Sequence, residues 1–255
     1  MAADDNPFDL TGKVAVITGP ARGIGRGIAL ALGRAGADVA AVGRTASTAL
    51  AEDLGRMGRR CATIRADLRD PAQVDRVVPA AVDALGRVDI LVNNAGDTIR
   101  KPALEVTPEE WHGVLQVNLH AVFRLCQDAA RVMMREGGRG KIINVASLMS
   151  VQGGILIAAY TASKGAVGQL TKLLANEWAP FGINVNAIIP GYVATELTRD
   201  LWADPVRNPA ILARIPAGRG GRPEDLGGAA VFLASRASDY VHGHLLAVDG
   251  GWLAR

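Results

Sequence analysis

Two side chains that can carry a proton lie four residues apart in the segment 158–178. Tyr160 and Lys164 have the spacing that brings side chains to one face of a helix, and the segment has a helical pattern. A free tyrosine has a pKa of about 10 and is a poor base at neutral pH, whereas a lysine ammonium one turn away is expected to lower that pKa. The pair therefore indicates proton transfer to or from an alcohol or carbonyl oxygen.

Ser147 and Asn118 are further polar residues that could complete such a site. Ser147 ends an apolar run, and its hydroxyl can hold a substrate oxygen while Tyr160 gives or takes the proton. Asn118 lies within an otherwise apolar helical stretch, where a buried amide requires hydrogen-bond partners. Each feature has an ordinary alternative, because a Tyr-x-x-x-Lys pair arises by chance, a serine can terminate a strand and an asparagine can kink a helix. It is their combination that favours a catalytic group.

A glycine-rich turn, Thr-Gly-Pro-Ala-Arg-Gly-Ile-Gly, occupies residues 18–25 directly after the first apolar run. Gly19 permits a tight turn, Gly23 lets the backbone approach a pyrophosphate, and Gly25 lets a helix pack closely on a strand. The helix that begins here presents free N–H groups, including that of Ile24, and the positive end of its dipole to phosphates. The turn predicts a dinucleotide-binding site, with a purely structural turn as the alternative.

The residues after the second apolar run bear on which dinucleotide is bound. An acid at this position would accept a hydrogen bond from the ribose 2′-hydroxyl of NAD, but the sequence reads Gly43-Arg44. Arg44, joined by Arg22 of the glycine turn, offers guanidinium groups that suit a 2′-phosphate, so these residues favour NADP. The alternative is that Arg44 stacks on the adenine and accepts either cofactor.

Short segments after the third and fourth apolar runs are expected to contact the same dinucleotide. Asp67 could accept a hydrogen bond from the adenine amino group; its alternative is a role at a helix N-terminus, for which Asp70 before a proline is better suited. An Asn-Asn-Ala-Gly sequence brings small backbone groups close to the ribose. The residues expected here are Asp67, Leu68, Asn94, Ala95 and Gly96.

Apolar runs that suit strands alternate with helical segments along the chain. The expected strands are 13–18, 38–42, 61–65, 88–93, 141–147, 183–189 and 245–248. The expected helices are 23–36, 47–58, 71–85, 108–136 with a kink near 113–116, 158–178 and 223–234, and residues 190–222 are expected to be irregular. Continuously apolar strands alternating with helices indicate a parallel sheet covered on both faces. Residues 1–255 are therefore predicted to form one α/β domain, a Rossmann-type doubly wound fold with a seven-stranded parallel sheet and its ligand at the carboxyl ends of the strands.

Composition excludes several other classes of protein. The 255 residues are 49% hydrophobic and 21% charged, with a net charge of +3, which suits a large core and rules out disorder. No apolar run approaches the roughly 20 residues that span a bilayer. The first 13 residues contain Asp4, Asp5 and Asp9 and no hydrophobic stretch, so we expect no secretory signal and a cytoplasmic location. The two cysteines show no metal-ligand or disulfide pattern, and the scattered arginines do not indicate nucleic-acid binding.

Together these motifs resemble those of the short-chain dehydrogenase/reductase family, and the resemblance covers nearly the whole chain. It implies a catalytic set of Ser147, Tyr160 and Lys164, with Lys164 also binding the nicotinamide ribose. It implies that Asn118 supports a water-linked proton relay and that the protein forms homotetramers. The segment implied to hold the nicotinamide carboxamide comprises Pro190, Gly191, Val193 and Thr195. One departure is Pro20-Ala21, where relatives often have alanine and serine, so a hydroxyl available to a 2′-phosphate is missing.

Three segments, 141–160, 208–214 and 238–255, bear on the substrate. They are similar to the 2-dehydro-3-deoxy-D-gluconate 5-dehydrogenases and gluconate 5-dehydrogenases of the family, which implies hydride transfer at a secondary alcohol of a sugar acid. Those relatives often use NAD, which conflicts with the preference indicated by Arg44. Residues 192–221 are expected to cover the substrate.

Two residues outside the catalytic set are candidates for holding this small-molecule substrate. Gln152 follows Ser147 closely and could hydrogen-bond a polyol, and Arg100 is one of several cations that could neutralise a carboxylate or simply be solvated. An alternative within the family is a 3-oxoacyl-(acyl-carrier-protein) reductase, which shares the catalytic residues. An alternative of another class is a cofactor-binding regulator without turnover, which the intact catalytic set disfavours.

Overall fold

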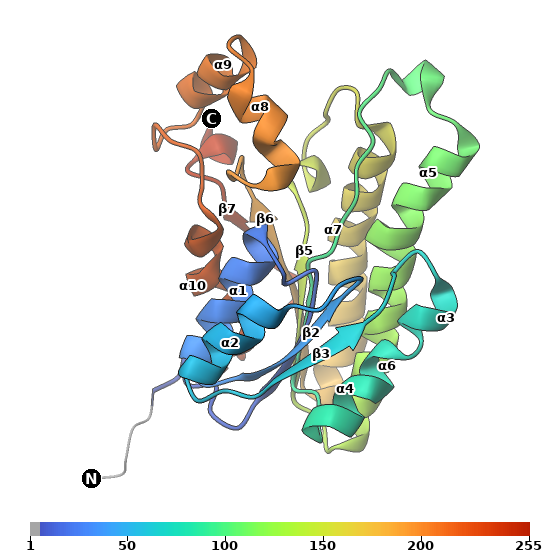
Figure 1. The fold of residues 1–255 in the computed structure, drawn as a ribbon, viewed down its shortest axis with the longest axis vertical. Coiled ribbons are helices and arrows are strands. Elements are labelled where there is room, and N and C mark those ends of the chain that lie inside the picture. Colours follow the sequence, from blue (N-terminus) through green and yellow to red (C-terminus); the bar gives the residue numbers. More distant parts are fainter. Residues whose placement is uncertain (1–5) are drawn as a thin grey trace.

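The computed structural model describes residues 6–255, except for the side chain of Leu197, so Asp4 and Asp5 lie outside the described residues. Its centre is a sheet of seven parallel strands in the order β3-β2-β1-β4-β5-β6-β7 (Figure 1). The strands are β1 Val14–Thr18, β2 Asp38–Gly43, β3 Cys61–Arg65, β4 Ile90–Asn93, β5 Gly140–Val145, β6 Ile183–Pro190 and β7 Leu245–Val248. The order places β1 beside β4 in the middle of the sheet, where the direction of winding reverses. The predicted seven-stranded doubly wound fold is confirmed.

Burial explains why the central segments form strands. Every residue of β1, β4 and β6 is buried, because helices cover both faces of the sheet at these positions. The edge strands β3 and β7 are only partly buried, since each pairs with a neighbour on one side alone. The continuous apolar runs of the sequence therefore correspond to the middle of the sheet.

Helices α1, α2 and α10 pack on one face of the sheet, and α4, α6 and α7 pack on the other (Figure 1). The helices are α1 Gly23–Arg34, α2 Thr48–Arg56, α3 Pro71–Val74, α4 Val77–Leu85, α5 Pro108–Leu115, α6 Ala121–Arg135, α7 Ala158–Trp178, α8 Arg199–Ala203, α9 Arg207–Arg214 and α10 Gly227–Ala234. Each face thus has its own apolar core, and both cores contact the strands that carry the site. Within residues 6–255, no helix is both long and apolar enough to cross a membrane.

Three segments differ from the sequence-based prediction. The expected helix 71–85 is divided into α3 and α4. The kink expected near 113–116 lies slightly later, at a π-helical turn, Gln116–His120, between α5 and α6. Residues 190–222 were predicted to be irregular, but they contain α8 and α9, which are too short for an apolar period to identify them.

Candidate active site

A cleft of about 610 Å³ opens at the carboxyl ends of the strands, between the turn after β1 and the segment after β6. Every residue predicted to contact a dinucleotide lines it: Gly19, Arg22, Gly23, Ile24, Gly25, Arg44, Asp67, Leu68, Asn94, Ala95, Gly96, Tyr160, Lys164, Pro190, Gly191, Val193 and Thr195. Ser147 lines the cleft as well. The parallel sheet brings these residues together because all its strands end at the same edge.

The turn after β1 depends on glycine for its backbone conformation and for a close approach. Gly19 and Gly23 have φ angles of 65° and 54°, in the left-handed region that favours glycine. A side chain at Gly25 would collide with the carbonyl oxygen of Gly19 and with the side-chain amide of Asn94. Helix α1 therefore starts directly against the end of β1, and the residues of its first turn line the cleft.

Thr18, the last residue of β1, ties the glycine turn to the turn after β4. Its hydroxyl accepts hydrogen bonds from the backbone N–H groups of Asn94 and Ala95, both at 3.0 Å. The Asn94 amide donates in return to the carbonyl oxygens of Thr18 and Gly19, at 2.9 and 3.1 Å. Thr18 thus holds the two turns of the cleft in register, and no sequence motif around it predicts this.

The shape of the cleft fits a nicotinamide dinucleotide. A Cβ atom at Gly23 would lie 3.4 Å from Cγ2 of Thr195, an ordinary contact, so it is the φ of 54° that requires glycine where α1 faces the segment after β6. The first turn of α1 offers backbone N–H groups to the phosphates of such a cofactor, and Lys164 offers an ammonium at the other end. A bound nicotinamide would supply the hydride donor or acceptor of the reaction.

Lys164 carries an ammonium group in an almost fully buried position. The residue is 5% exposed, and its Nζ donates to the carbonyl oxygen of Val145 at 2.6 Å, its one hydrogen-bond partner within residues 6–255. Burial lowers the pKa of Lys164 to about 8. Nζ lies 5.8 Å from the centroid of the Tyr160 ring, so the two side chains share one face of α7, as the spacing predicted.

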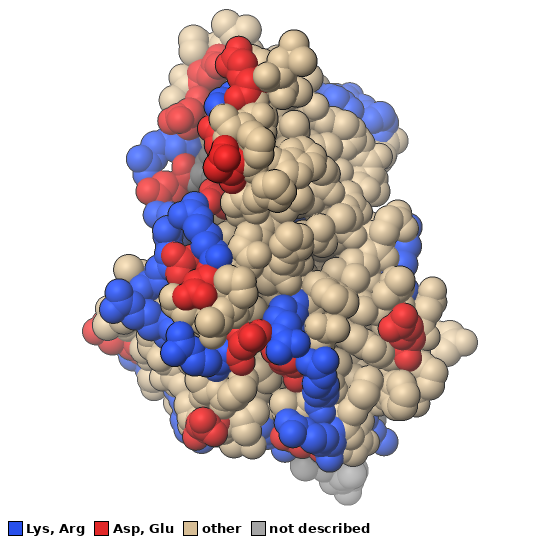
Figure 2. Space-filling view, turned by 90° about the vertical axis from the view of Figure 1, so that its right-hand side faces the viewer, with Lys and Arg blue, Asp and Glu red and all other residues tan. Residues whose placement is uncertain are grey.

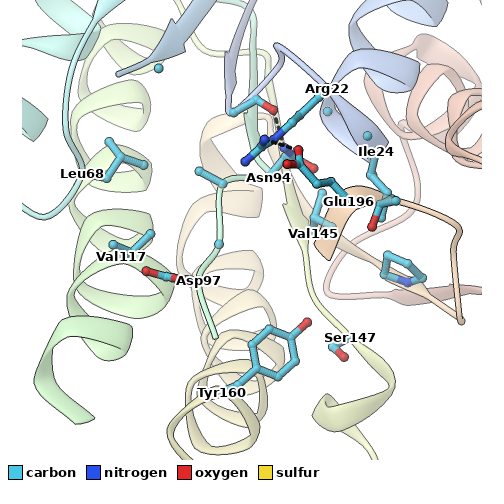
Figure 3. A pocket seen from close by; sticks show the side chains of 18 of the residues that line it. Arg22, Ile24, Leu68, Asn94, Asp97, Val117, Val145, Ser147, Tyr160 and Glu196 are labelled. Atoms are coloured by element: carbon cyan, nitrogen blue, oxygen red, sulfur yellow. Dashed lines mark hydrogen bonds and ion pairs between the residues drawn. The ribbon is translucent and has the colours of Figure 1, made fainter. Parts of the chain in front are cut away.

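The phenol oxygen of Tyr160 points to the side of the cleft where Ser147 lies (Figure 3). Burial raises the pKa of Tyr160, while a hydrogen bond with Ser147 acts in the opposite direction. Desolvation of the phenolate outweighs this hydrogen bond, and the expectation that Lys164 lowers the pKa together with the positive ring of a bound nicotinamide stays a prediction. Tyr160 is accordingly protonated at neutral pH, in the form that can donate a proton to a carbonyl oxygen.

A short 3-10 turn, Leu148–Ser150, holds Ser147 against helix α7. The Ser147 hydroxyl oxygen accepts a hydrogen bond from the N–H of Met149 at 3.2 Å. The Ser150 hydroxyl donates to the backbone carbonyl oxygen of Lys164 at 2.6 Å. These bonds join the turn after β5 to the helix that carries Tyr160, so the catalytic hydroxyl groups keep their relative position.

Asn118 is fully buried in the π-helical turn and does not line the cleft. Its Oδ1 accepts from the N–H of Asp97 at 2.8 Å, and its Nδ2 donates to the carbonyl oxygen of Asp97 at 2.9 Å. Nδ2 also donates to the Ser163 hydroxyl of α7 at 3.1 Å. The side chain thus braces the segment after β4 against α7, and its part in a proton relay stays a prediction.

Two ion pairs that no sequence motif predicts connect segments that line the cleft. Arg22 pairs with Glu196, at the start of the segment expected to cover the substrate (Figure 3), and Arg69 pairs with Asp97. Arg22 is therefore already engaged by a carboxylate. Arg44, the other arginine predicted to hold a 2′-phosphate, is exposed. Neither pair has a local sequence signal, because the partners are far apart along the chain.

The remaining predicted residues lie partly in the cleft and partly beside it. Asp70 caps α3 by accepting from the N–H of Ala72 at 2.9 Å. Asp67 lines the cleft and accepts from the N–H of Arg69 at 3.0 Å, and its contact with adenine stays a prediction. The two residues predicted to hold the substrate, Gln152 and Arg100, are not part of the cleft lining, and their roles stay predictions.

The fold and the site define an oxidoreductase that uses a nicotinamide dinucleotide. A family model described as enoyl-(acyl carrier protein) reductase matches residues 19–253. The chain is 51% identical over 250 residues to the 2-dehydro-3-deoxy-D-gluconate 5-dehydrogenase of Dickeya dadantii (strain 3937), covering 98% of this chain and 99% of that protein. It is 53% identical over 249 residues to the enzyme of the same name from Bacillus subtilis (strain 168), covering 97% of each chain.

The chain is also similar to a solved structure of a sugar-acid dehydrogenase. The crystal structure of a gluconate 5-dehydrogenase from Burkholderia cenocepacia J2315, in complex with NADP and tartrate, is 41% identical, with a TM-score of 0.93 over 98% of both chains. The chain therefore belongs to the short-chain dehydrogenase/reductase family. It is an NAD(P)-dependent oxidoreductase that acts on CH–OH groups.

Proposed function

We propose that this enzyme transfers a hydride between a nicotinamide cofactor and a secondary alcohol or ketone of a sugar acid such as 2-dehydro-3-deoxy-D-gluconate. The observation that carries the proposal is that Ser147, Tyr160 and Lys164 line one cleft, with the Lys164 ammonium 5.8 Å from the centroid of the Tyr160 ring. Relatives that are about half identical over almost their full length are named for this substrate. The Burkholderia relative binds tartrate, itself a hydroxy acid, together with NADP.

The side chains of the cleft have distinct tasks in this reaction. In the direction of reduction, the Ser147 hydroxyl holds the carbonyl oxygen and Tyr160 donates its proton to that oxygen. The nearby Lys164 ammonium stabilises the phenolate that remains. In the direction of oxidation, the same groups act in reverse, and Tyr160 accepts the hydroxyl proton.

Turnover by the purified enzyme tests the proposal. The substrates to compare are 2-dehydro-3-deoxy-D-gluconate, 5-keto-D-gluconate and an acetoacetyl thioester, each with NAD(H) and NADP(H). We expect turnover of at least one of the sugar acids and little reduction of the thioester. Reduction of the thioester alone would instead assign a 3-oxoacyl-(acyl-carrier-protein) reductase and overturn the proposed substrate.

Arg44 is expected to set the preference between the two cofactors, because Arg22 is paired with Glu196. Replacing Arg44 with aspartate places a negative charge beside the position of a 2′-phosphate, so we expect NADPH to bind about 10-fold or more weakly. NADH should bind equally well or better, since a carboxylate can accept from its ribose 2′-hydroxyl. Fluorescence titration with both cofactors measures the two dissociation constants.

Arg135→Asp is a suitable control for Arg44→Asp, because it makes the same change of charge at an exposed position outside the cleft. It should alter neither dissociation constant. Equal affinities of the wild-type enzyme for NADH and NADPH, unchanged in the Arg44 variant, would show that Arg44 does not bind a phosphate.

We further infer that the enzyme works in the cytoplasm as a homotetramer. Both Cys61 and Cys126 are free thiols, as is usual in a reducing compartment. Figure 2 shows a broad area with few charged side chains on the side of the molecule that carries α5, α6 and α7. Phe123 of α6 and Leu173 of α7 are 40% and 49% exposed. A helical surface of this kind is suited to a symmetric interface between subunits.

A further inference from the structure

The last residues of the chain fold back over the end of α9. The chain end lies beside α9 in Figure 1. The Arg255 guanidinium donates to the carbonyl oxygens of Ala213 and Arg214, at 2.6 and 3.2 Å, where α9 ends. Three residues earlier, Trp252 is 4% exposed and starts a short 3-10 turn. The terminal segment is therefore packed, and its aromatic residue belongs to the core.

Trp252 contacts three segments that belong to or adjoin the active site. Its indole Nε1–H donates to Oε1 of Gln152 at 3.2 Å. Its ring packs edge-on against Tyr192, with centroids 4.7 Å apart, and Tyr192 directly follows Gly191 of the cleft. The guanidinium carbon of Arg214 lies 4.0 Å from the centroid of the Trp252 ring. Trp252 thus links the loop after the catalytic serine, the segment after β6 and the end of α9.

The hydrogen bond from Trp252 determines how the Gln152 side chain is oriented. An indole N–H can only donate, so the atom of Gln152 that faces it must be the carbonyl oxygen and not the nitrogen. The NH₂ group of Gln152 therefore points away from Trp252. No acceptor within residues 6–255 takes a hydrogen bond from this NH₂ group, and Gln152 is partly exposed. The amide is thus held as a donor with free capacity.

Gln152 lies at a suitable place for this donor to meet the substrate. Its backbone N–H donates to the carbonyl oxygen of Leu148 at 3.0 Å, so it belongs to the turn that begins at Ser147. Through Trp252 it is tied to Tyr192, next to Gly191 of the cleft. The amide lies outside the cleft lining, and it is held between the turn that begins at Ser147 and the segment that follows Gly191, both of which start at a residue of the cleft.

Arg214 adds positive charge to the same cluster. Its guanidinium stacks on the Trp252 ring, and within residues 6–255 it takes part in no ion pair. Its charge is thus not neutralised by a carboxylate of the described chain. A free amide donor and an uncompensated guanidinium, both in contact with Trp252, are groups that suit a polyhydroxy carboxylate.

We propose that Trp252 is a positioning residue for substrate binding: it orients the Gln152 amide so that its NH₂ group donates to an oxygen of the sugar acid. The inference rests on the proposed function for the nature of the substrate. It goes beyond that function because it assigns a task to Trp252. The proton transfer by Ser147, Tyr160 and Lys164 does not itself involve this residue.

The test replaces single hydrogen-bonding groups and compares KM with kcat for the sugar acid. Trp252→Phe keeps a ring for Tyr192 and Arg214 but removes the N–H, and we expect KM to rise about 3- to 10-fold. Gln152→Glu keeps an acceptor for the indole but removes the NH₂ group, so KM should rise at least as much. In both variants kcat should stay within about twofold, and the dissociation constant of the cofactor should not change.

Gln152→Leu and the double variant Trp252→Phe/Gln152→Leu, together with Trp252→Phe and the wild-type enzyme, form a double-mutant cycle. If Trp252 acts through Gln152, the double variant should have the KM of Gln152→Leu alone. Trp178→Phe, a change of the same kind at the end of α7, serves as the control and should leave KM unchanged.

The outcomes separate this inference from the proposed function. If the wild-type enzyme turns over no sugar acid, the proposed function fails. If it does, but Trp252→Phe keeps the wild-type KM or its effect adds in full to that of Gln152→Leu, the positioning role is wrong. If Trp252→Phe does not fold, Gln152→Glu provides the test, because Gln152 is partly exposed and its replacement should not disturb the core. A wild-type KM in this variant would overturn the inference.

Discussion

Replacing Tyr160 with phenylalanine is expected to lower kcat by at least about 1,000-fold, because the one group positioned to exchange a proton with the substrate oxygen is removed. The ring stays in place beside Lys164, and none of the bonds that shape the glycine turn involves the phenol oxygen. Cofactor binding should therefore stay close to that of the wild-type enzyme. Steady-state turnover and a fluorescence titration with NAD(P)H measure the two properties on one protein sample.

Tyr240 provides the matched control for this substitution. Its side chain is fully exposed, so Tyr240→Phe makes the same chemical change with no expected effect on turnover. Near-normal turnover by the Tyr160 variant would rule out the assigned proton donor. A parallel loss of cofactor binding would also contradict the expectation, because it would show that the phenol oxygen holds the cofactor or the fold of the cleft.

Replacing Lys164 with methionine is expected to lower kcat at least about 100-fold and to make the cofactor-free protein more stable. Activity falls because the ammonium that stabilises the Tyr160 phenolate is lost. Stability rises because a buried charge with one carbonyl partner, Val145, is replaced by an apolar side chain of similar length. The fall of the pKa from 10.5 to about 8 corresponds to roughly 3 kcal/mol, and the lost hydrogen bond offsets about 1 kcal/mol of that gain.

The pH dependence of this gain follows from the direction of the pKa shift. The folded protein holds the Lys164 proton less tightly than the unfolded chain does, since its pKa is about 8 against 10.5. Below pH 8 both states are charged, and the folded wild-type protein bears the full cost of burying the ammonium. Between these two values the wild-type protein becomes more stable as pH rises, because the unfolded chain binds more protons. The advantage of the variant should therefore be complete at about pH 7 and decline towards about pH 10.

Thermal unfolding without cofactor measures this difference. A gain of about 2 kcal/mol in a chain of this length corresponds to a Tm roughly 4–8 °C higher than wild type at neutral pH. Lys172→Met, on the exposed side of the same helix, is the control and should show no such gain. A lower Tm for Lys164→Met at neutral pH would mean that the ammonium stabilises the fold through contacts stronger than its bond to Val145.

The parts of the site that could be predicted are those whose spacing is local. Tyr160 and Lys164 are one helical turn apart, and the glycines of the first turn follow a strand directly, so the sequence itself places them at the cleft. The alternation of apolar runs with helical segments predicted the sheet for the same reason. Local pattern missed the short helices α8 and α9, the division between α3 and α4, and the exact place of the turn between α5 and α6.

Contacts between distant segments could not be predicted in this way. Glu196 meets Arg22 across 174 positions, and Trp252 meets Gln152 across 100. Nothing in the neighbourhood of either residue indicates its partner, because the sheet order brings them together. The same holds for Thr18, which reads as the last residue of a strand and yet accepts two hydrogen bonds from the turn after β4.

The origin of the cleft lining affects which parts of the molecule can unfold locally. Its lining comes from both halves of the chain, from the end of β1 to the segment after β6. A dinucleotide bound along this lining would contact both halves at once, so neither could unfold locally without releasing it. Binding at the cleft therefore links the two halves into one cooperative unit. Slower amide exchange is expected even in strands such as β2 and β5, which lie on opposite sides of the β1–β4 pair.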